Sequence, residues 1–233
     1  MTATDRDQPG PERGWLDIVL PCLDEAGALP AVLAGLPAGA RAIVADNGSA
    51  DGSAALAGRL GATVVAASPR GYGSACAAGL AAATAPVVAF ADCDASVDLA
   101  DVAALAAAVR DGDTDLVTTR RRPVRAGSGA SAWPLHARVG AWTVARLLGR
   151  RAGIRLTDVG PVRVAQTGAL RSLGLADRGS GYPVETVLRA ARAGWRVSEV
   201  DLPYRPRVGR SKVTGTLAGT VRAVRDMSSV LAR

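Results

Sequence analysis

Short apolar runs alternate with longer segments of mixed polarity over the first half of the chain. Five of these runs have the length and composition of buried β-strands, at residues 15–20, 41–45, 62–66, 86–91 and 115–118. The segments between them predict helices, at residues 24–36, 51–60, 71–83 and 97–110. Strands this apolar are typical of a sheet covered on both faces. The pattern therefore predicts an α/β fold with a mostly parallel central sheet and helices on both of its faces.

The second half of the chain is less regular. It predicts a loop at 120–131, a helix at 135–148, a strand at 163–165, a helix at 183–193, a strand at 195–200, a basic loop at 204–212 and a helix at 213–231. The last helix either packs on the domain or lies on an anionic surface. Residues 1–14 are polar and rich in Pro and Gly, which predicts a disordered tail. Residues 15–233 are expected to form a single domain that ends in the C-terminal helix.

Polar clusters follow the predicted strands of the first half. They lie at 24–25, 46–49, 70–73 and 92–94. In a parallel sheet the carboxyl ends of the strands share one edge, and ligands bind beyond that edge. The four clusters are therefore expected to form one binding site.

Asp92 and Asp94 stand two residues apart at the end of the apolar run VVAFA. Positions i and i+2 of a strand face the same side, so the two carboxylates would repel each other unless a cation lay beside them. Oxygen ligands of this kind suit Mg²⁺ or Mn²⁺. The alternative is that one aspartate caps the following helix and the other is solvated.

Composition narrows the class of protein. The net charge is +7, which favours phosphates, nucleic acid or an anionic membrane as partners. Aromatic residues supply only 3% of the chain, and no nucleic-acid-binding module is present, so we expect no nucleic-acid partner. The three cysteines lie far apart in the sequence, which predicts buried thiols in a reducing cytoplasm. No apolar run approaches the ~18 residues of a membrane span. A cytoplasmic location follows, with peripheral contact at the inner face of the membrane left open.

Seven motifs in order resemble the family 2 glycosyltransferases of GT-A fold, and within them the dolichyl- or polyprenyl-phosphate sugar transferases. The resemblance covers residues 17–219. Its motifs are IVLPCLDEAGAL, VADNGSADGS, RGYGSACAAGL, VAFADCDAS, LTDVGPVRV, GYPVETVLRAARAGWRVSEVDLPYRPR and GRSKVTGT.

The resemblance implies a nucleotide-sugar site and a metal site. The nucleotide-sugar positions are Pro21, Leu23, Glu25, Asp46, Asn47, Asp51, Arg70, Gly71, Gly73, Asp92 and Cys93. Asn47 stands where the family usually has a second aspartate, and Asp51 would support the loop. Asp92 and Asp94 would hold the metal and the donor diphosphate.

The resemblance also implies catalytic and acceptor groups. Asp94, Asp158 and Glu185 are the catalytic candidates, although Glu185 would equally suit the first turn of a helix through the helix dipole. The acceptor or phosphate positions are Arg120, Arg122, Arg207, Arg210, Ser211 and Lys212, for which the alternative is a solvated basic face. Pro161 and Val162 stand where many relatives have Gly-Phe, which is a departure in the acceptor region.

The function implied is metal-dependent, inverting transfer of a sugar from a UDP- or GDP-sugar to an acceptor, most readily a polyprenyl or dolichyl phosphate. Two alternatives stand beside it. The acceptor is a soluble small molecule, or the protein binds nucleotide sugars without catalysis.

Overall fold

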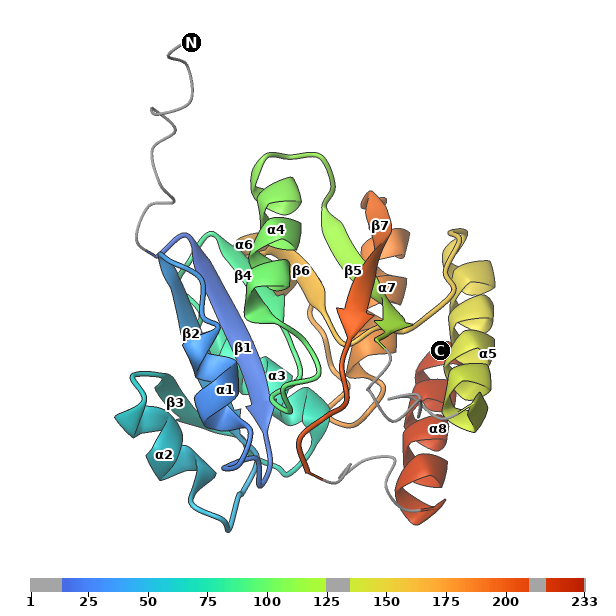
Figure 1. Ribbon diagram of the computed structural model, residues 1–233. Helices are drawn as coiled ribbons and strands as arrows, with labels where there is room; N and C mark the ends of the chain where they lie inside the picture. The colour runs from blue at the N-terminus through green and yellow to red at the C-terminus, as the bar shows by residue number, and fades with distance from the viewer. Residues whose placement is uncertain (1–13, 125–134, 210–216, 233) are drawn as a thin grey trace, which may run out of the picture.

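The computed structural model describes residues 14–124, 135–209 and 217–232. A seven-stranded sheet in the order β3-β2-β1-β4-β6-β5-β7 forms its centre (Figure 1). The strands are β1 (Leu16–Cys22), β2 (Ala40–Asp46), β3 (Thr63–Ala66), β4 (Val87–Phe90), β5 (Leu116–Pro123), β6 (Arg163–Gln166) and β7 (Val197–Tyr204). β6 is antiparallel to β4 and β5, whereas the other pairings are parallel. The predicted mostly parallel sheet is confirmed.

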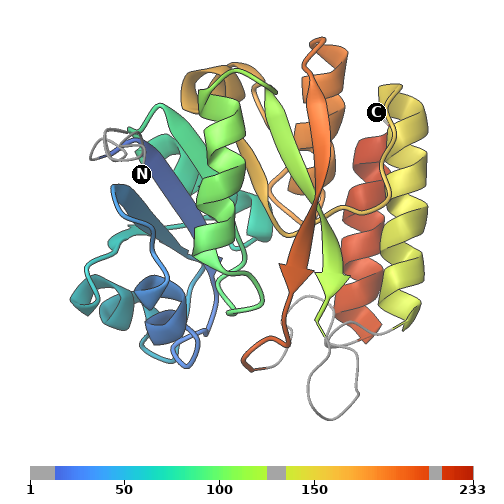
Figure 2. The ribbon, with the colours of Figure 1, turned by 45° about the horizontal axis from the view of Figure 1, so that its top comes forward.

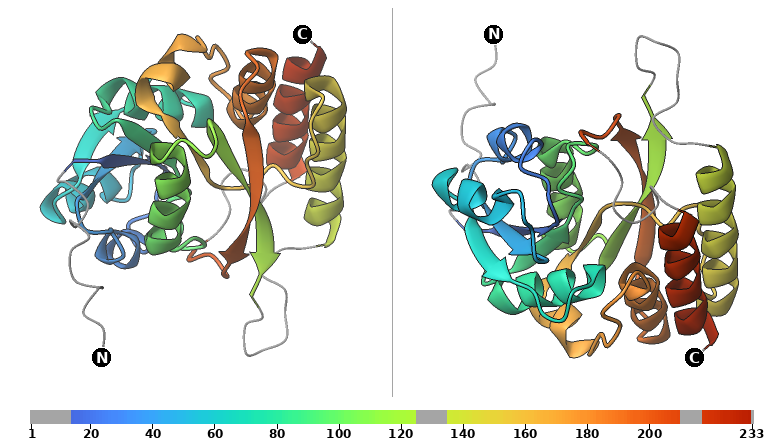
Figure 3. Two further views of the ribbon diagram at one scale, coloured as in Figure 1. Left: turned by 90° about the horizontal axis from the view of Figure 1, so that it is seen from above. Right: turned by 90° about the horizontal axis from the view of Figure 1, so that it is seen from below.

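Helices cover both faces of the sheet, as predicted (Figure 3). They are α1 (Leu29–Ala34), α2 (Ser53–Arg59), α3 (Tyr72–Ala82), α4 (Leu99–Arg110), α5 (Leu135–Ala152), α6 (Thr167–Ser172), α7 (Tyr182–Arg192) and α8 (Leu217–Ala232). One hydrophobic core joins the sheet to α1, α2 and α4, and a second joins its other face to α3, α6 and α7. The helices α5 and α8 lie side by side at one end of the molecule and pack against α7 (Figure 2).

The alternation along β1 shows why this strand is apolar at most of its positions. Leu16, Ile18 and Leu20 enter the first core, and Val19 enters the second. All four side chains are fully buried. A strand with both faces covered has no position for a solvated side chain.

Four elements differ from the sequence-based prediction. The strand predicted at 195–200 is wrong at its end, because β7 runs to Tyr204 along β5. The loop expected from residue 120 is wrong for residues 120–123, because β5 continues to Pro123 by pairing with β7. The first helix begins at Leu29 and not at residue 24, because Asp24 has a positive φ of 52°. The short helix α6 was not predicted.

The edge formed by the carboxyl ends of the parallel strands carries the candidate site. β1, β5 and β7 all point towards this edge (Figure 1). The predicted N-terminal tail falls almost entirely outside the described residues. No helix within the described ranges has the length and apolarity that crossing a bilayer requires.

Candidate active site

The loop after β1 is held by side chains of the loop after β2 and of the first residue of α2. The backbone N–H of Glu25 donates to Ser53 Oγ at 2.9 Å. The next N–H, from Ala26, donates to Asp51 Oδ2 at 2.9 Å. Asp51 also accepts from the N–H of Ser53 at 2.9 Å, so one carboxylate organises both loops. These bonds fix the place from which the Glu25 side chain reaches into the site.

Asn47 and the glycines before α3 form the next wall. Asn47 Oδ1 accepts from the N–H of Gly71 at 2.8 Å, which ties the ends of two neighbouring strands together. A Cβ on Gly71 would lie 2.1 Å from the carbonyl oxygen of Arg178, and one on Gly73 would lie 2.5 Å from that of Asp177. The missing side chains therefore let the loop before α7 approach α3, a role that the sequence did not indicate.

Asp92 and Asp94 follow β4 directly. Asp94 is buried, and its Oδ1 accepts from the N–H and the hydroxyl of Ser96 at 3.0 and 2.5 Å. Asp92 is half-buried, and within the described residues its carboxylate makes no hydrogen bond or ion pair. Burial, followed by the negative charge of Asp94, raises the pKa of Asp92 to about 6, although Arg163 opposes the shift. One carboxylate is thus held in place and the other is uncommitted.

Arg207 lies between the first and fourth strand ends. Its Nη2 is 3.1 Å from Glu25 Oε1, and its Nη1 is 3.4 Å from Asp94 Oδ2. The N–H of Val208 also donates to the carbonyl oxygen of Asp94 at 2.9 Å. Residues 207 and 208 at the start of the basic loop therefore close over the carboxylates of Glu25 and Asp94.

The two aspartates fit a hard cation that also binds substrate oxygens. The described residues contain no group of three or more metal-ligating side chains. A cation held by one or two carboxylates together with phosphate oxygens needs no such group. The uncommitted carboxylate of Asp92 beside Asp94 supplies the oxygen ligands that Mg²⁺ and Mn²⁺ prefer.

Arg163 on β6 is the residue that the sequence analysis missed. Only 2% of it is exposed, and its partners are neutral: Gly160 O at 3.1 Å and Tyr72 Oη at 2.8 Å. Its guanidinium also lies 6.0 Å from the ring centroid of Phe90. This buried positive charge faces the region of Asp92, whose pKa it lowers. A lone arginine on a short strand gives no signal in a single sequence.

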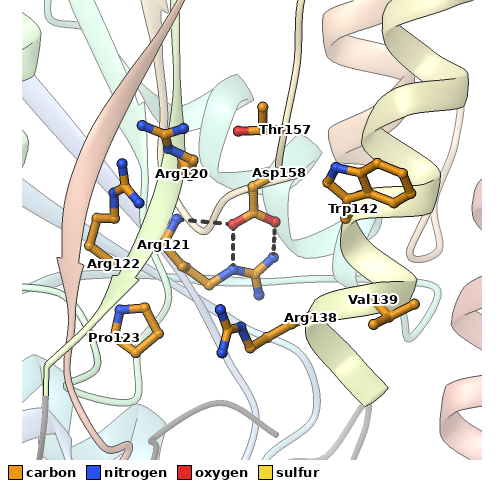
Figure 4. Close-up of a pocket in the computed structure, with 9 residues that line it drawn as sticks. All are labelled: Arg120, Arg121, Arg122, Pro123, Arg138, Val139, Trp142, Thr157 and Asp158. Carbon is orange, nitrogen blue, oxygen red and sulfur yellow. Dashed lines mark hydrogen bonds and ion pairs between the residues drawn. The ribbon is translucent and has the colours of Figure 1, made fainter. Parts of the chain in front are cut away.

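Asp158 is engaged by Arg121 of β5. Its two oxygens accept from Arg121 Nε at 2.8 Å and Nη2 at 2.7 Å, and one oxygen also accepts from the backbone N–H of Arg121 at 3.0 Å (Figure 4). Asp158 is 3% exposed. A carboxylate bound in this way ties β5 to the loop before β6, and both of its oxygens are engaged.

A basic cavity of about 350 Å³ opens between the end of β5 and α5 (Figure 4). Its lining is Arg120, Arg121, Arg122, Pro123, Arg138, Val139, Trp142, Thr157 and Asp158. Arg120 and Arg122 each bond to Asp201 on β7 through Nε. Arg138 has no ion-pair partner within the described residues, so its guanidinium is available to an anion.

Glu185 lies in the first turn of α7. Its Oε2 accepts from the N–H groups of Ala176 and Asp177 at 2.9 and 2.7 Å. Its Oε1 accepts from Arg189 Nε at 2.8 Å. These bonds make Glu185 the anchor of the loop that packs on Gly71 and Gly73. The structure does not join it to Asp94 or Asp158.

The remaining predicted residues take varied positions. Cys93 is buried in the first core, where a hydrogen bond with Cys22 lowers the pKa of Cys22 and raises that of Cys93. Pro21 and Leu23 are half-buried, and Arg70 is exposed. Asp46 accepts from a backbone N–H of its own loop at 3.3 Å. Arg210, Ser211 and Lys212 lie outside the described residues.

Comparison with known proteins shows the family to which the chain belongs. The sequence model of Glycosyl transferase family 2 matches residues 17–173. An uncharacterized glycosyltransferase of Mycobacterium tuberculosis (strain ATCC 25618 / H37Rv) is 49% identical over 215 residues, which cover 92% of this chain and 96% of that protein. The dolichyl-phosphate hexose transferase of Haloferax volcanii is 29% identical over 202 residues, covering 85% of this chain and 86% of that protein.

A solved structure shares the fold. Glucosyl-3-phosphoglycerate synthase from Mycobacterium tuberculosis, in complex with Mn²⁺, UDP and glucosyl-3-phosphoglycerate, matches with a TM-score of 0.70 and 24% identity, covering 93% of this chain and 78% of that chain. The sheet order, the carboxylates at its edge and the family match over more than half of the sequence lead to one assignment: the chain is a glycosyltransferase of GT-A fold and belongs to glycosyl transferase family 2.

Proposed function

We propose that this glycosyltransferase transfers a hexose, with inversion, from a UDP- or GDP-sugar to an acceptor that carries a phosphate, and that the physiological acceptor is a polyprenyl phosphate. The observation that carries the proposal is the carboxyl edge of the sheet. There Asp94, next to Asp92, contacts the guanidinium of Arg207, and that guanidinium is also paired with Glu25.

The donor would bind across the first four strand ends. Glu25 and Asp46 lie at two of them and can accept hydrogen bonds from ribose or base, and Asp92 with Asp94 would hold Mg²⁺ or Mn²⁺. The cation, when bound, would supply positive charge to the departing diphosphate. Arg207 would add a second positive charge beside the departing diphosphate. Its guanidinium would leave Asp94 and bind a phosphate oxygen instead.

The acceptor would bind at the basic cavity beside β5. An acceptor oxygen attacks the anomeric carbon, and the bond between that carbon and the diphosphate oxygen breaks. A phosphate oxygen is already ionised near neutral pH and needs no strong base. The engagement of Asp158 by Arg121 and of Glu185 by Arg189 is consistent with that requirement.

The named relatives support a phosphate-bearing acceptor without choosing its type. One is a dolichyl-phosphate hexose transferase, and the structural neighbour is a glucosyl-3-phosphoglycerate synthase crystallised with glucosyl-3-phosphoglycerate. A soluble acceptor is therefore the second candidate. Cytoplasmic location, with contact to the inner face of the membrane, belongs to the lipid-acceptor proposal.

The donor site is tested by calorimetric titration with UDP-glucose and with GDP-mannose, each with and without Mn²⁺. We expect binding of one donor, dependent on the metal. Asp94→Asn should keep the fold and lose both metal-dependent binding and turnover. Near-normal activity of this variant would exclude the proposed role of the carboxylate pair.

The acceptor is tested by following transfer of radiolabelled hexose in detergent to a short-chain polyprenyl phosphate or to 3-phosphoglycerate. Product extracted into organic solvent supports the lipid acceptor, and product that stays in water supports the soluble one. Donor binding without transfer to either would favour a nucleotide-sugar-binding protein.

A further inference from the structure

Helix α5 carries an exposed apolar face on the outside of the molecule. Val139, Trp142 and Leu147 are 56%, 53% and 47% exposed, and these are large values for side chains of their kind. Residues at spacings of three and four share one side of a helix. Val139 and Trp142 are therefore neighbours, and Leu147, eight residues after Val139, lies on the same outer half of the helix. We call these three side chains the α5 strip.

The opposite side of α5 accounts for its attachment to the domain. Ala145 and Leu148 are fully buried in the second core. A Cβ on Gly149 would lie 2.7 Å from the carbonyl oxygen of Ile154, so this side is closely packed. The α5 strip is thus not needed to hold the helix in place, and none of the residues that the structure describes covers it.

The charges around the α5 strip favour an anionic partner. The sequence of α5, LHARVGAWTVARLLGRRA, contains four arginines and no acidic residue. Arg146 lies over the ring of Trp142, 5.7 Å from the centroid, and Arg150 is exposed one turn further along. Tryptophan beside arginine, with aliphatic neighbours, is the composition that binds at the interface of an anionic bilayer.

The α5 strip runs into the basic cavity. Val139 and Trp142 belong to both, and Arg138 joins them at the cavity wall (Figure 4). Val124, just beyond the end of β5, is a further exposed apolar residue at 43%. A surface that rests on a bilayer along α5 would therefore bring the mouth of the cavity to the level of lipid phosphates.

The C-terminal helix does not provide such a surface in its described part. Ala223, Val230 and Leu231 of α8 are buried, and Asp226 accepts from the N–H of Ser180 at 3.0 Å. The packing alternative considered for this helix is therefore the one observed for these residues.

We propose that the α5 strip docks the protein on an anionic membrane, with the side chains of Val139, Trp142 and Leu147 in the interface and the arginines on lipid phosphates. This inference rests on the proposed function, because it names the surface by which the enzyme would reach a lipid acceptor. It concerns binding alone, so it is testable without donor, metal or catalysis.

The experiment is co-sedimentation of the full chain with vesicles of phosphatidylcholine, with or without phosphatidylglycerol. We expect binding to the phosphatidylglycerol vesicles, weakened by salt, and little binding to phosphatidylcholine alone. The double variant Val139→Glu/Trp142→Glu should lower the partition coefficient at least about ten-fold, because it removes two apolar anchors and adds two negative charges.

A matched control separates this effect from charge alone. Leu60 and Val64 are 43% and 36% exposed. They lie at the β3 edge of the sheet, four strands away from β6 and five from β5, beside which α5 lies. Leu60→Glu/Val64→Glu makes the same changes there and should bind vesicles much more strongly than the α5 double variant. Circular dichroism and donor titration establish that both variants remain folded.

Three outcomes would overturn the proposal. The wild-type chain does not bind phosphatidylglycerol vesicles, the two double variants lose binding equally, or light scattering shows a dimer that only the α5 double variant dissociates. The last result would assign the strip to a second copy of the chain. Donor binding measured on the same samples distinguishes failure of docking from failure of the proposed function.

Discussion

Arg207 joins Glu25 to Asp94. It thereby connects a carboxylate of the loop after β1 with one of the two carboxylates proposed to hold the metal. The distances are 3.1 and 3.4 Å. Its Nε is buried and has no hydrogen-bond partner within the described residues. A guanidinium in this place competes with a cation for Asp94 and remains able to bind a phosphate oxygen once the cation is present.

We predict that Arg207→Gln separates these two effects. Loss of the positive charge beside Asp94 should tighten the binding of Mn²⁺ in the absence of donor. Loss of the contact to the leaving diphosphate should lower kcat about 100-fold, as removal of one charge-stabilising donor does in other enzymes. Calorimetric metal titration and steady-state kinetics measure the two quantities on one preparation.

Arg205→Gln is the matched control, because it removes the same charge from the same loop. Arg205 pairs at 3.4 Å with Asp98, and both side chains are more than a third exposed. Metal affinity and kcat should stay close to those of the wild type. If both variants behave alike, the effect comes from net charge and not from the contact with Asp94.

The pKa of Asp92 leads to a second prediction, for the pH dependence of metal binding. Burial and the charge of Asp94 raise this pKa to about 6. Below that pH Asp92 is protonated, and a cation must displace the proton. Mn²⁺ affinity should therefore be nearly constant above pH 6 and fall by up to about ten-fold per pH unit below it. Asp92→Asn should bind weakly without this dependence, and a midpoint near pH 4 in the wild type would contradict the shift.

The elements of the first half were predictable because β1, β2 and β4 are apolar on both faces and polar at their ends. The second half was harder for a physical reason. Arg120 to Arg122 look like a solvated loop, yet they continue β5, where Asp201 of β7 lies opposite Arg120 and bonds to both Arg120 and Arg122. Such a pairing joins residues about eighty positions apart and leaves no local pattern.

The site shows the same division. The positions of Glu25 and Asp94 followed from strand ends that share an edge. The buried environment of Arg163, and the engagement of Asp158 by Arg121, depend on tertiary contacts that a single sequence does not contain. Sequence reasoning therefore predicted which carboxylates lie at the strand ends. It could not predict that some of the candidate carboxylates, such as Asp158, are already paired with arginines.

A third prediction concerns Asp158. Asp158→Asn should lower the free energy of unfolding by about 3–5 kcal/mol, because it removes the charged partner of a two-pronged ion pair in a mostly buried place. Urea denaturation measures the change. Asp115→Asn, which breaks an exposed pair with Arg196, should have little effect. An Asp158 variant that is fully stable but inactive would instead indicate a direct role in proton transfer.

The last prediction concerns two glycines with opposite surroundings. A Cβ on Gly71 would lie 2.1 Å from the backbone oxygen of Arg178, whereas one on Gly140 would have no atom within 4 Å. Gly71→Ala must displace backbone and should cost about 1–3 kcal/mol of unfolding free energy. Gly140→Ala, in the interior of α5, should add about 1 kcal/mol, because alanine favours the helix over glycine by that amount. Thermal unfolding of the two variants should therefore shift in opposite directions. A neutral Gly71→Ala would show that the loop before α7 does not rest on α3, and Glu185, which anchors that loop, would lose the structural role assigned to it.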